Sequence, residues 1–296
     1  MIEANVDQEA LDNLAFASRK PPELMHHRLV ECPVCDLLYA SPAPAPEQLH
    51  GAYESAGYDS GDEARFASHT YARSLHRFIS EIPDRGGAID IGAGDGAFLH
   101  DLLEAGFDPG EVVGIEPSEA PIAAAQPDVR ALIRPGTFSA ADFEPGAFRL
   151  VTSFQTLEHV HDPAALCEGA HRILAPGGAL MVVCHDRRSI INRLLGRRSP
   201  IFDVQHMQLF SPRSLRTLIE DAGFERVRLR HIVNRYPLRY WLRLAPLPSA
   251  LKQRLTRPGR LGFPVSLPVG NVLAVGFKPA EKDSGPRTGT ARIGPA

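Results

Sequence analysis

The chain has 296 residues, of which 44% are apolar and 23% are charged, and its formal net charge is −3 at pH 7. This composition supports a sizeable buried core and excludes a globally disordered chain or a uniformly basic nucleic-acid binder. No apolar run approaches the ~20 residues that a membrane-spanning helix needs, and the acidic N-terminus lacks the features of a signal peptide. We therefore expect a soluble, cytoplasmic protein.

The near-neutral total conceals an uneven distribution of charge. Residues 1–186 contain 11 Lys and Arg against 29 Asp and Glu, a net −18, whereas residues 187–261 contain 17 against 4, a net +13. A basic segment attached to an acidic body favours an anionic partner for that segment.

Three regions follow one another along the chain. Residues 1–65 form a polar N-terminal extension without a clear period, and residues 279–296 form a polar tail that we expect to be disordered. Between them, apolar residues at helical spacing predict a helix over 66–82, which Pro83 ends. From residue 87 onward, short apolar runs alternate with amphipathic segments.

These alternating segments are typical of an α/β protein. Strands are expected at 88–91, 111–115, 129–133, 148–154 and 179–184, with two closing strands at 226–233 and 271–277. Helices are expected at 97–105, from Ser118 onward, at 163–174 and at 211–222. Strands that alternate with helices predict a doubly wound, mostly parallel sheet within residues 66–278, in which 187–261 is a basic insertion.

The first of these strands runs into a glycine-rich loop, Asp90-Ile91-Gly92-Ala93-Gly94-Asp95-Gly96. Glycines allow positive φ angles and a close approach of the backbone to a ligand. Three interpretations compete: a tight turn without a ligand, a dinucleotide fingerprint, and an S-adenosylmethionine loop. Asp90 lies inside the strand, where it would repel a pyrophosphate but suit a positively charged amino-acid group. Glu116, about 20 residues after the loop, can accept both ribose hydroxyls of either cofactor.

Later segments carry a resemblance to a known family. They are V-G-I-E-P at 113–117, T-L-E-H-V-H-D-P at 156–163, L-A-P-G-G at 174–178 and H-M-Q-L-F-S-P at 206–212. With the glycine loop, and in this order, they resemble the class I S-adenosylmethionine-dependent methyltransferases over residues 87–224. The most similar branch is the ubiquinone O-methyltransferase-like and sugar C-methyltransferase-like group.

The resemblance implies a Rossmann-like sheet of seven strands, of which the last is antiparallel, and S-adenosylmethionine as the cofactor. It also implies the positions that contact the cofactor, which are Asp90, Gly92, Ala93, Gly94, Gly96, Glu116, Pro117, Gln155 and Leu157. The sequence departs from the family pattern at Arg149, where an Asp is usual, and at 184–186, where C-H-D replaces V-P-N. Gln155 also replaces an acid that helps ubiquinone-type members to bind a divalent ion, so we expect no metal there.

The pair Cys32 and Cys35 resembles one knuckle of a zinc ribbon. A structural zinc ion needs four ligands. The two other cysteines, Cys167 and Cys184, belong to the expected core, and nothing fixes the geometry of the neighbouring histidines. We therefore predict a degenerate half-ribbon that binds no metal.

His159 follows the end of the fourth expected strand, on the ligand edge of the sheet, and His206 lies in the H-M-Q-L-F-S segment. His159 is the candidate catalytic residue, as a general base or a group that orients the substrate, although a capping role for its loop remains equally open. His206 is interpreted as loop packing, with substrate contact as the alternative. Residues 235–255 mix Arg with aromatic and Leu residues, which suits a solvated cap, a peripheral membrane contact or a site for an anionic substrate.

The sequence thus predicts an S-adenosylmethionine-dependent methyltransferase. Its acceptor is expected to be an anionic small-molecule, sugar-like or carrier-linked compound that is methylated on oxygen or carbon, with no nucleic acid as partner. Two alternatives stay open: a non-catalytic cofactor-binding or assembly protein, and an NAD-dependent oxidoreductase.

Overall fold

The computed structural model describes residues 1–7, 24–45, 61–245, 247, 251, 254–255 and 261–280. The tail that we predicted at 279–296 lies outside the described residues apart from its first two.

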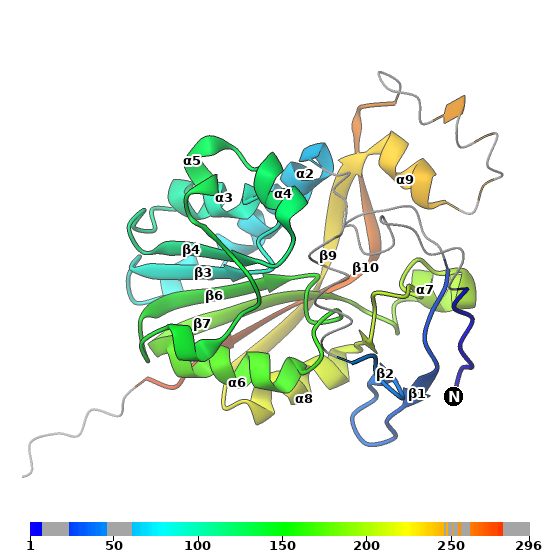
Figure 1. Ribbon diagram of the computed structural model, residues 1–296, viewed down its shortest axis with the longest axis horizontal. Helices are drawn as coiled ribbons and strands as arrows, with labels where there is room; N and C mark the ends of the chain where they lie inside the picture. The colour runs from blue at the N-terminus through cyan, green and yellow to red at the C-terminus, as the bar shows by residue number, and fades with distance from the viewer. Residues whose placement is uncertain are drawn as a thin grey trace, which may run out of the picture.

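A seven-stranded sheet forms the centre of the molecule, with the strand order β5-β4-β3-β6-β7-β10-β9 (Figure 1). The strands are β3 (Gly87–Ile91), β4 (Val112–Glu116), β5 (Ile133–Pro135), β6 (Phe148–Phe154), β7 (Leu174–His185), β9 (Glu225–Pro237) and β10 (Pro264–Phe277). Neighbouring strands from β5 to β7 are parallel, and β10 runs antiparallel to both β7 and β9. The predicted fold, with its last strand antiparallel, is confirmed.

Helices cover both faces of this sheet (Figure 1). One face carries α2 (Gly61–Leu75), α3 (Ala97–Glu104), α4 (Glu119–Ala124) and α5 (Pro127–Arg130), and the other carries α6 (Pro163–Ile173) and α8 (Pro212–Asp221). The two long helices of the second face begin where the sequence predicted. Asp162 accepts the backbone N–H groups of Ala164 and Ala165, and Ser211 exchanges hydrogen bonds with Ser214 in a capping box.

Two elements have bounds that differ from the predicted ones. The third strand begins at Ile133 rather than 129, because Pro127 occupies the first position of α5, which suits its fixed φ angle. The helix expected over 66–82 ends at Leu75. Beyond it the N–H groups of Arg77 and Phe78 bond to carbonyls three residues back, which leads into the 3₁₀ turn η1 (Ile79–Glu81).

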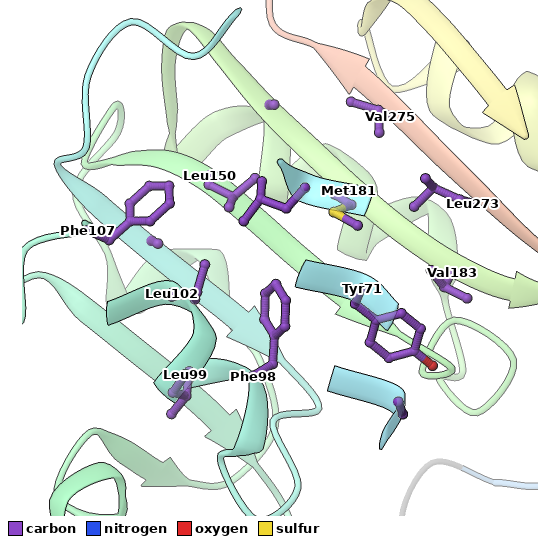
Figure 2. Close-up of a cluster of buried hydrophobic side chains, with 14 of the residues drawn as sticks. Tyr71, Phe98, Leu99, Leu102, Phe107, Leu150, Met181, Val183, Leu273 and Val275 are labelled. Carbon is purple, nitrogen blue, oxygen red and sulfur yellow. The ribbon is translucent and has the colours of Figure 1, made fainter. Parts of the chain in front are cut away.

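The core is divided by the sheet into two layers. Figure 2 shows the first layer, in which Tyr71 and Phe98 from α2 and α3 lie over Met181 and Val183 of β7. The other face of β7 contributes Cys184, which is fully buried in the second layer, as predicted for a core residue. Because successive residues of a strand point to opposite faces, the uninterrupted apolar run of β7 supplies both layers.

β9 and β10 extend beyond the rest of the sheet as a two-stranded ribbon (Figure 1). Residues 271–277 of β10 pair with β7, whereas residues 264–267 pair only with β9, and the register shifts between them. Helix α9 (Leu238–Leu244) follows the ribbon, and its Trp241 donates a hydrogen bond from Nε1 to the carbonyl oxygen of Val265 at 2.9 Å. The ribbon thereby carries aromatic residues past the end of β7.

The N-terminal extension forms a small sheet with a distant segment. β1 (Leu29–Glu31) pairs with β2 (Leu38–Ala40), which in turn pairs with β8 (Gln208–Leu209). Cys32 and Cys35 lie in the turn between β1 and β2, and Asp36 of this turn pairs with Arg187 and Arg188, which follow β7. Short helices α7 (Ile190–Leu195), η3 (Gly196–Arg198) and η2 (Ala140–Asp142) complete the described elements.

The basic segment 187–261 therefore contains β9, which is an edge strand of the sheet, and the helices α8 and α9. Within the described ranges, no helix combines the length and the apolar character that crossing a bilayer requires.

Candidate active site

A cavity of about 1210 Å³ opens at the carboxyl ends of the parallel strands. Its wall comes from α2, from the loops that follow β3, β4 and β6, from the end of β7, and from β9, β10 and α9. Eight of the ten predicted site residues line it, namely Asp90, Gly92, Ala93, Gly94, Glu116, Pro117, Gln155 and His159. Gly96 and Leu157 do not. The ligand-binding edge of doubly wound sheets lies at this end of the strands.

The glycine loop has the backbone that its sequence predicted. Gly92, Gly94 and Gly96 have φ angles of 82°, 58° and 75°. A Cβ at Gly94 would meet nothing within 4 Å, so this residue faces the open cavity. A Cβ at Gly96 would instead lie 3.1 Å from Val129, which shows that Gly96 allows α5 to pack closely rather than exposing backbone to a ligand.

Two buried carboxyl groups flank this loop. Asp90 accepts a hydrogen bond from the Thr152 hydroxyl at 2.6 Å, and burial, assisted by the nearby Glu116, raises the pKa of Asp90 to about 7. Glu116 accepts the backbone N–H groups of Gly94 and Ser118 at 2.8 and 2.9 Å, and burial raises its pKa as well. Glu116 therefore ties the glycine loop to the start of α4 while both groups face the cavity.

The two residues predicted near the cofactor after β6 have different environments. Gln155 lines the cavity with a φ angle of 54°, and its buried Nε2 has no hydrogen-bond partner in the described part of the chain. Leu157 is fully buried in the second core layer. A buried, unpaired amide is costly unless a ligand satisfies it.

Three histidines form another part of the cavity wall. The ring of His206 lies 4.9 Å from that of His159 and 5.1 Å from that of His185, measured between centroids. Beneath them lies Glu158, which is completely buried and accepts both the backbone N–H and Nδ1 of His185, at 2.6 and 3.1 Å.

The pKa values of Glu158 and His206 are both shifted by their surroundings. Burial alone would raise the pKa of Glu158, but the hydrogen bond from His185 and the charges of the three histidines outweigh it and lower the pKa to about 2. Burial and the neighbouring His185 lower the pKa of His206. This part of the cavity wall therefore holds a carboxylate surrounded by imidazoles.

A polar row continues from this cluster across the sheet. His185 lies directly opposite Asn271 of β10, on the face where Val183 and Leu273 belong to the core. Asn234 of β9 also lines the cavity, two residues beyond Ile232, which is the partner of Asn271. Both amides are nearly inaccessible to solvent, and the Oδ1 atom of each lacks a partner among the described residues. Tyr236, Tyr240 and Trp241 form the adjoining aromatic wall.

Comparison with known proteins agrees with this geometry. The family described as Methyltransferase domain matches residues 63–229, which is more than half of the chain. The chain belongs to this methyltransferase domain family.

Two curated relatives match part of the chain. The ubiquinone biosynthesis O-methyltransferase of Pseudomonas aeruginosa is 33% identical over 126 residues, which cover 39% of this chain and 50% of the relative. That of Methylococcus capsulatus is 34% identical over 99 residues, covering 31% and 40%. The chain therefore spans about half the length of the curated relatives that it matches, or less.

Solved structures are similar in fold to the methyltransferase domain. A SAM-dependent methyltransferase from Archaeoglobus fulgidus covers 73% of this chain and 97% of its own, at 17% identity and a TM-score of 0.49.

The cavity of this methyltransferase domain fits S-adenosylmethionine as its cofactor. Gly94 presents open backbone, and Asp90 and Glu116 present carboxyl groups for which no ion pair with a cation is recorded among the described residues. The unpaired Nε2 of Gln155 offers a donor. Each of these features calls for a ligand with an ammonium group, hydroxyls and acceptor atoms.

The sequence prediction omitted several residues of the methyltransferase cavity. His185 was visible as an unusual residue in C-H-D at 184–186, but the sequence did not show that Glu158 supports it. Asn234 and Asn271 carry no motif. Each could be found only as a polar residue at an inward position of an otherwise apolar strand face. Which positions point inward is known only once the strand register is known.

The arginines of the basic segment are paired mainly outside the cavity. Among the described residues that line it there is no Lys or Arg. Four of the segment's arginines contact acids of other elements: Arg187 and Arg188 contact Glu31 and Asp36, and Arg226 and Arg228 contact Glu81. Arg216 pairs with Glu220 within α8.

Proposed function

We propose that this chain is an S-adenosylmethionine-dependent methyltransferase that acts on oxygen or carbon of a small-molecule, sugar-like acceptor with an anionic group. One observation carries the proposal: a single cavity joins the glycine loop to the histidine cluster and the polar row. A methyl donor at one end and an acceptor at the other would share one enclosed space, and positioning of this kind supplies much of the rate of a displacement reaction.

The acceptor end of the cavity supports a hydroxylated compound. The unpaired amide groups of Asn234 and Asn271 need partners, and hydroxyl groups can donate to or accept from an amide in either orientation. Tyr240 and Trp241 supply flat apolar surface beside them. A ring that carries hydroxyl groups satisfies both requirements at once.

The anionic group of the acceptor is assigned to the mouth of the cavity. Helix α9 contributes Tyr240, Trp241 and Leu244 to the wall, and the same helix carries Arg239 and Arg243. An acceptor whose ring lies against this wall would place a carboxylate or phosphate near the two guanidinium groups. The net charge of +13 over residues 187–261 favours this arrangement.

When bound, the cofactor supplies a methyl group on a positively charged sulfur atom. The residues of the chain hold and orient the two substrates. Asp90 would pair with the ammonium group and Glu116 would accept ribose hydroxyls, while the buried floor formed by Phe154 and Tyr71, whose rings stack at 4.3 Å, excludes water.

The proposal is tested by measuring S-adenosylhomocysteine after incubation with S-adenosylmethionine and three probes: catechol, glucuronate and acetylacetone. They offer an acidic hydroxyl, a sugar-like anion and an acidic carbon. Product formed with at least one probe supports the proposal. Calorimetric binding of S-adenosylmethionine without product from any probe favours a non-catalytic cofactor-binding protein. A thermal shift with NAD and none with S-adenosylmethionine would make the protein an oxidoreductase candidate.

A further inference from the structure

We propose that His185, held by the buried carboxylate of Glu158, is the group that removes the proton from the acceptor. This inference rests on the proposed methyltransferase function. It assigns a catalytic role to a residue that the sequence motifs do not mark, and it makes Glu158 a positioning residue.

The contact between the two side chains fixes which nitrogen of His185 carries the proton. Oε1 of Glu158 lies 3.1 Å from Nδ1 of His185 and accepts the backbone N–H of the same residue at 2.6 Å. A carboxylate can only accept, so Nδ1 must donate. In the neutral imidazole, Nε2 then carries the lone pair, as a general base requires.

The position of His185 leaves that lone pair available to an acceptor molecule. His185 lines the cavity, and its side chain is 25% exposed. No hydrogen bond to Nε2 is recorded among the described residues. Asn271 lies directly across the strand pair, and Asn234 lines the same cavity, so the base shares the cavity with the amides that would hold hydroxyl groups.

The other two histidines of the cluster are less suited to this role. His206 is buried, and its Nδ1 lies 2.8 Å from the carbonyl oxygen of Ile201. Burial and the charge of His185 lower the pKa of His206, which disfavours a second proton there. His159 follows Glu158 directly in the chain. Its ring contacts the ring of His206, which in turn contacts the ring of His185.

Three titratable groups lie around His185. They are Glu158 and His159 from the loop after β6 and His206 from the loop before β8, whereas Asp186 and His231 pair with each other and do not line the cavity. Glu158 is the group in hydrogen-bond contact, and it stabilises the imidazolium that forms when Nε2 takes a proton. The other imidazoles oppose a second positive charge, which favours prompt release of that proton.

The proton transfer balances as follows for a hydroxyl acceptor. The O–H bond breaks as the oxygen forms its bond to the methyl carbon, the electron pair of the S–CH₃ bond remains on sulfur, and the proton passes to Nε2 of His185. The imidazolium later releases the proton to water. An acidic C–H acceptor balances in the same way.

The kinetic test compares three matched variants with catechol as the probe. His185→Gln should lower kcat at least ~100-fold, the lower limit of general base catalysis, with S-adenosylmethionine affinity unchanged. His159→Gln should lower kcat much less. His231→Gln is the control, because His231 also contacts a carboxylate, Asp186 at 2.8 Å, but is exposed and does not line the cavity. Glu158→Gln should lower kcat and move the acid limb of its pH profile to lower pH, since the imidazolium loses its carboxylate partner.

A second readout needs no acceptor and no activity. Nitrogen-15 NMR of histidine-labelled wild-type protein, assigned with His185→Gln, should show His185 protonated on Nδ1 at neutral pH, and Glu158→Gln should disturb this tautomer. Protonation on Nε2 instead would overturn the proposal, as would a His185→Gln enzyme that keeps its rate or a His159→Gln enzyme that alone loses it. If wild-type protein forms no S-adenosylhomocysteine, the methyltransferase proposal fails, and the NMR result still decides the state of His185.

Discussion

The two ends of the cavity are built in different ways. The cofactor end comes from residues 90–95 and 116–118, two short runs at the carboxyl ends of adjacent strands. The acceptor end gathers Glu158, His185, Asn234 and Asn271, which are far apart in the sequence and meet only through the register of β7, β10 and β9. A local motif therefore encodes the first end, whereas the second depends on the assembled sheet.

The same contrast holds for the buried carboxyl groups. Asp90 and Glu158 are 3% and 0% exposed, so burial opposes ionisation of both. Burial raises the pKa of Asp90 to about 7, with a contribution from Glu116 and only partial opposition from the Thr152 hydroxyl, whereas histidines lower the pKa of Glu158 to about 2 despite its burial. Among the described residues, Asp90 has no recorded cationic partner, and a ligand can supply one. Glu158 already has histidines as its partners.

The largest expected effect comes from filling the cofactor end. Gly94→Val places a branched side chain where a Cβ has open space, so S-adenosylmethionine binding should fall below detection in calorimetry. Gly106→Val is the matched control: Gly106 also has a positive φ angle and nothing within 4 Å of its Cβ, but it lies outside the cavity. Both variants should lose a similar ~1–2 kcal/mol of stability. Equal affinity for the cofactor in the two variants would contradict the assignment of the loop.

The second effect is a pH dependence of cofactor binding. Because the pKa of Asp90 is raised to about 7, its carboxyl must lose a proton to pair with an ammonium group, so affinity should rise up to ~tenfold per pH unit towards that pH. Asp90→Asn, which keeps the acceptor for Thr152, should flatten the dependence. Without ligand, the free energy of unfolding should fall as the pH rises from 3.8, the ordinary value, to about 7. Calorimetry and thermal melts across this range measure both; an unchanged slope in Asp90→Asn would exclude Asp90 as the titrating group.

These contrasts explain what the sequence could and could not predict. The order of strands and helices followed from apolar runs, caps and glycines, and the positive φ angles at Gly92 and Gly94 followed from the motif itself. Leu157 looked like a neighbour of the cofactor, yet it is a core residue, since one residue along a loop decides which way a side chain points. The support of His185 by Glu158 joins residues 27 positions apart, and no local pattern encodes that pairing.

A smaller effect is expected at the mouth of the acceptor end. Arg239→Glu with Arg243→Glu should raise the KM for an anionic probe such as glucuronate by about threefold to tenfold, because partly exposed charges are screened. The cofactor affinity should stay unchanged. Arg226→Glu with Arg228→Glu makes the same charge change beside Glu81, away from the cavity wall, and should leave KM as it is. If moving from low to physiological salt leaves the KM of the wild-type enzyme constant, the anionic acceptor must be abandoned.

The smallest effect is expected at the cysteine pair, which lies outside both ends of the cavity. The turn that holds Cys32 and Cys35 is fastened by Asp36, whose contacts with Arg188 and Arg187 hold the pKa of its carboxyl well below the ordinary value. Since ion pairs hold this turn, Cys32→Ser should change the free energy of unfolding by no more than ~0.5 kcal/mol. Asp36→Asn should destabilise the protein more, because it removes one of the two carboxylates that Arg187 and Arg188 share. Metal analysis should find no stoichiometric zinc in the purified wild-type protein. One zinc ion per chain that disappears in Cys32→Ser would instead restore the ribbon, with its remaining ligands to be sought in the segment around the turn.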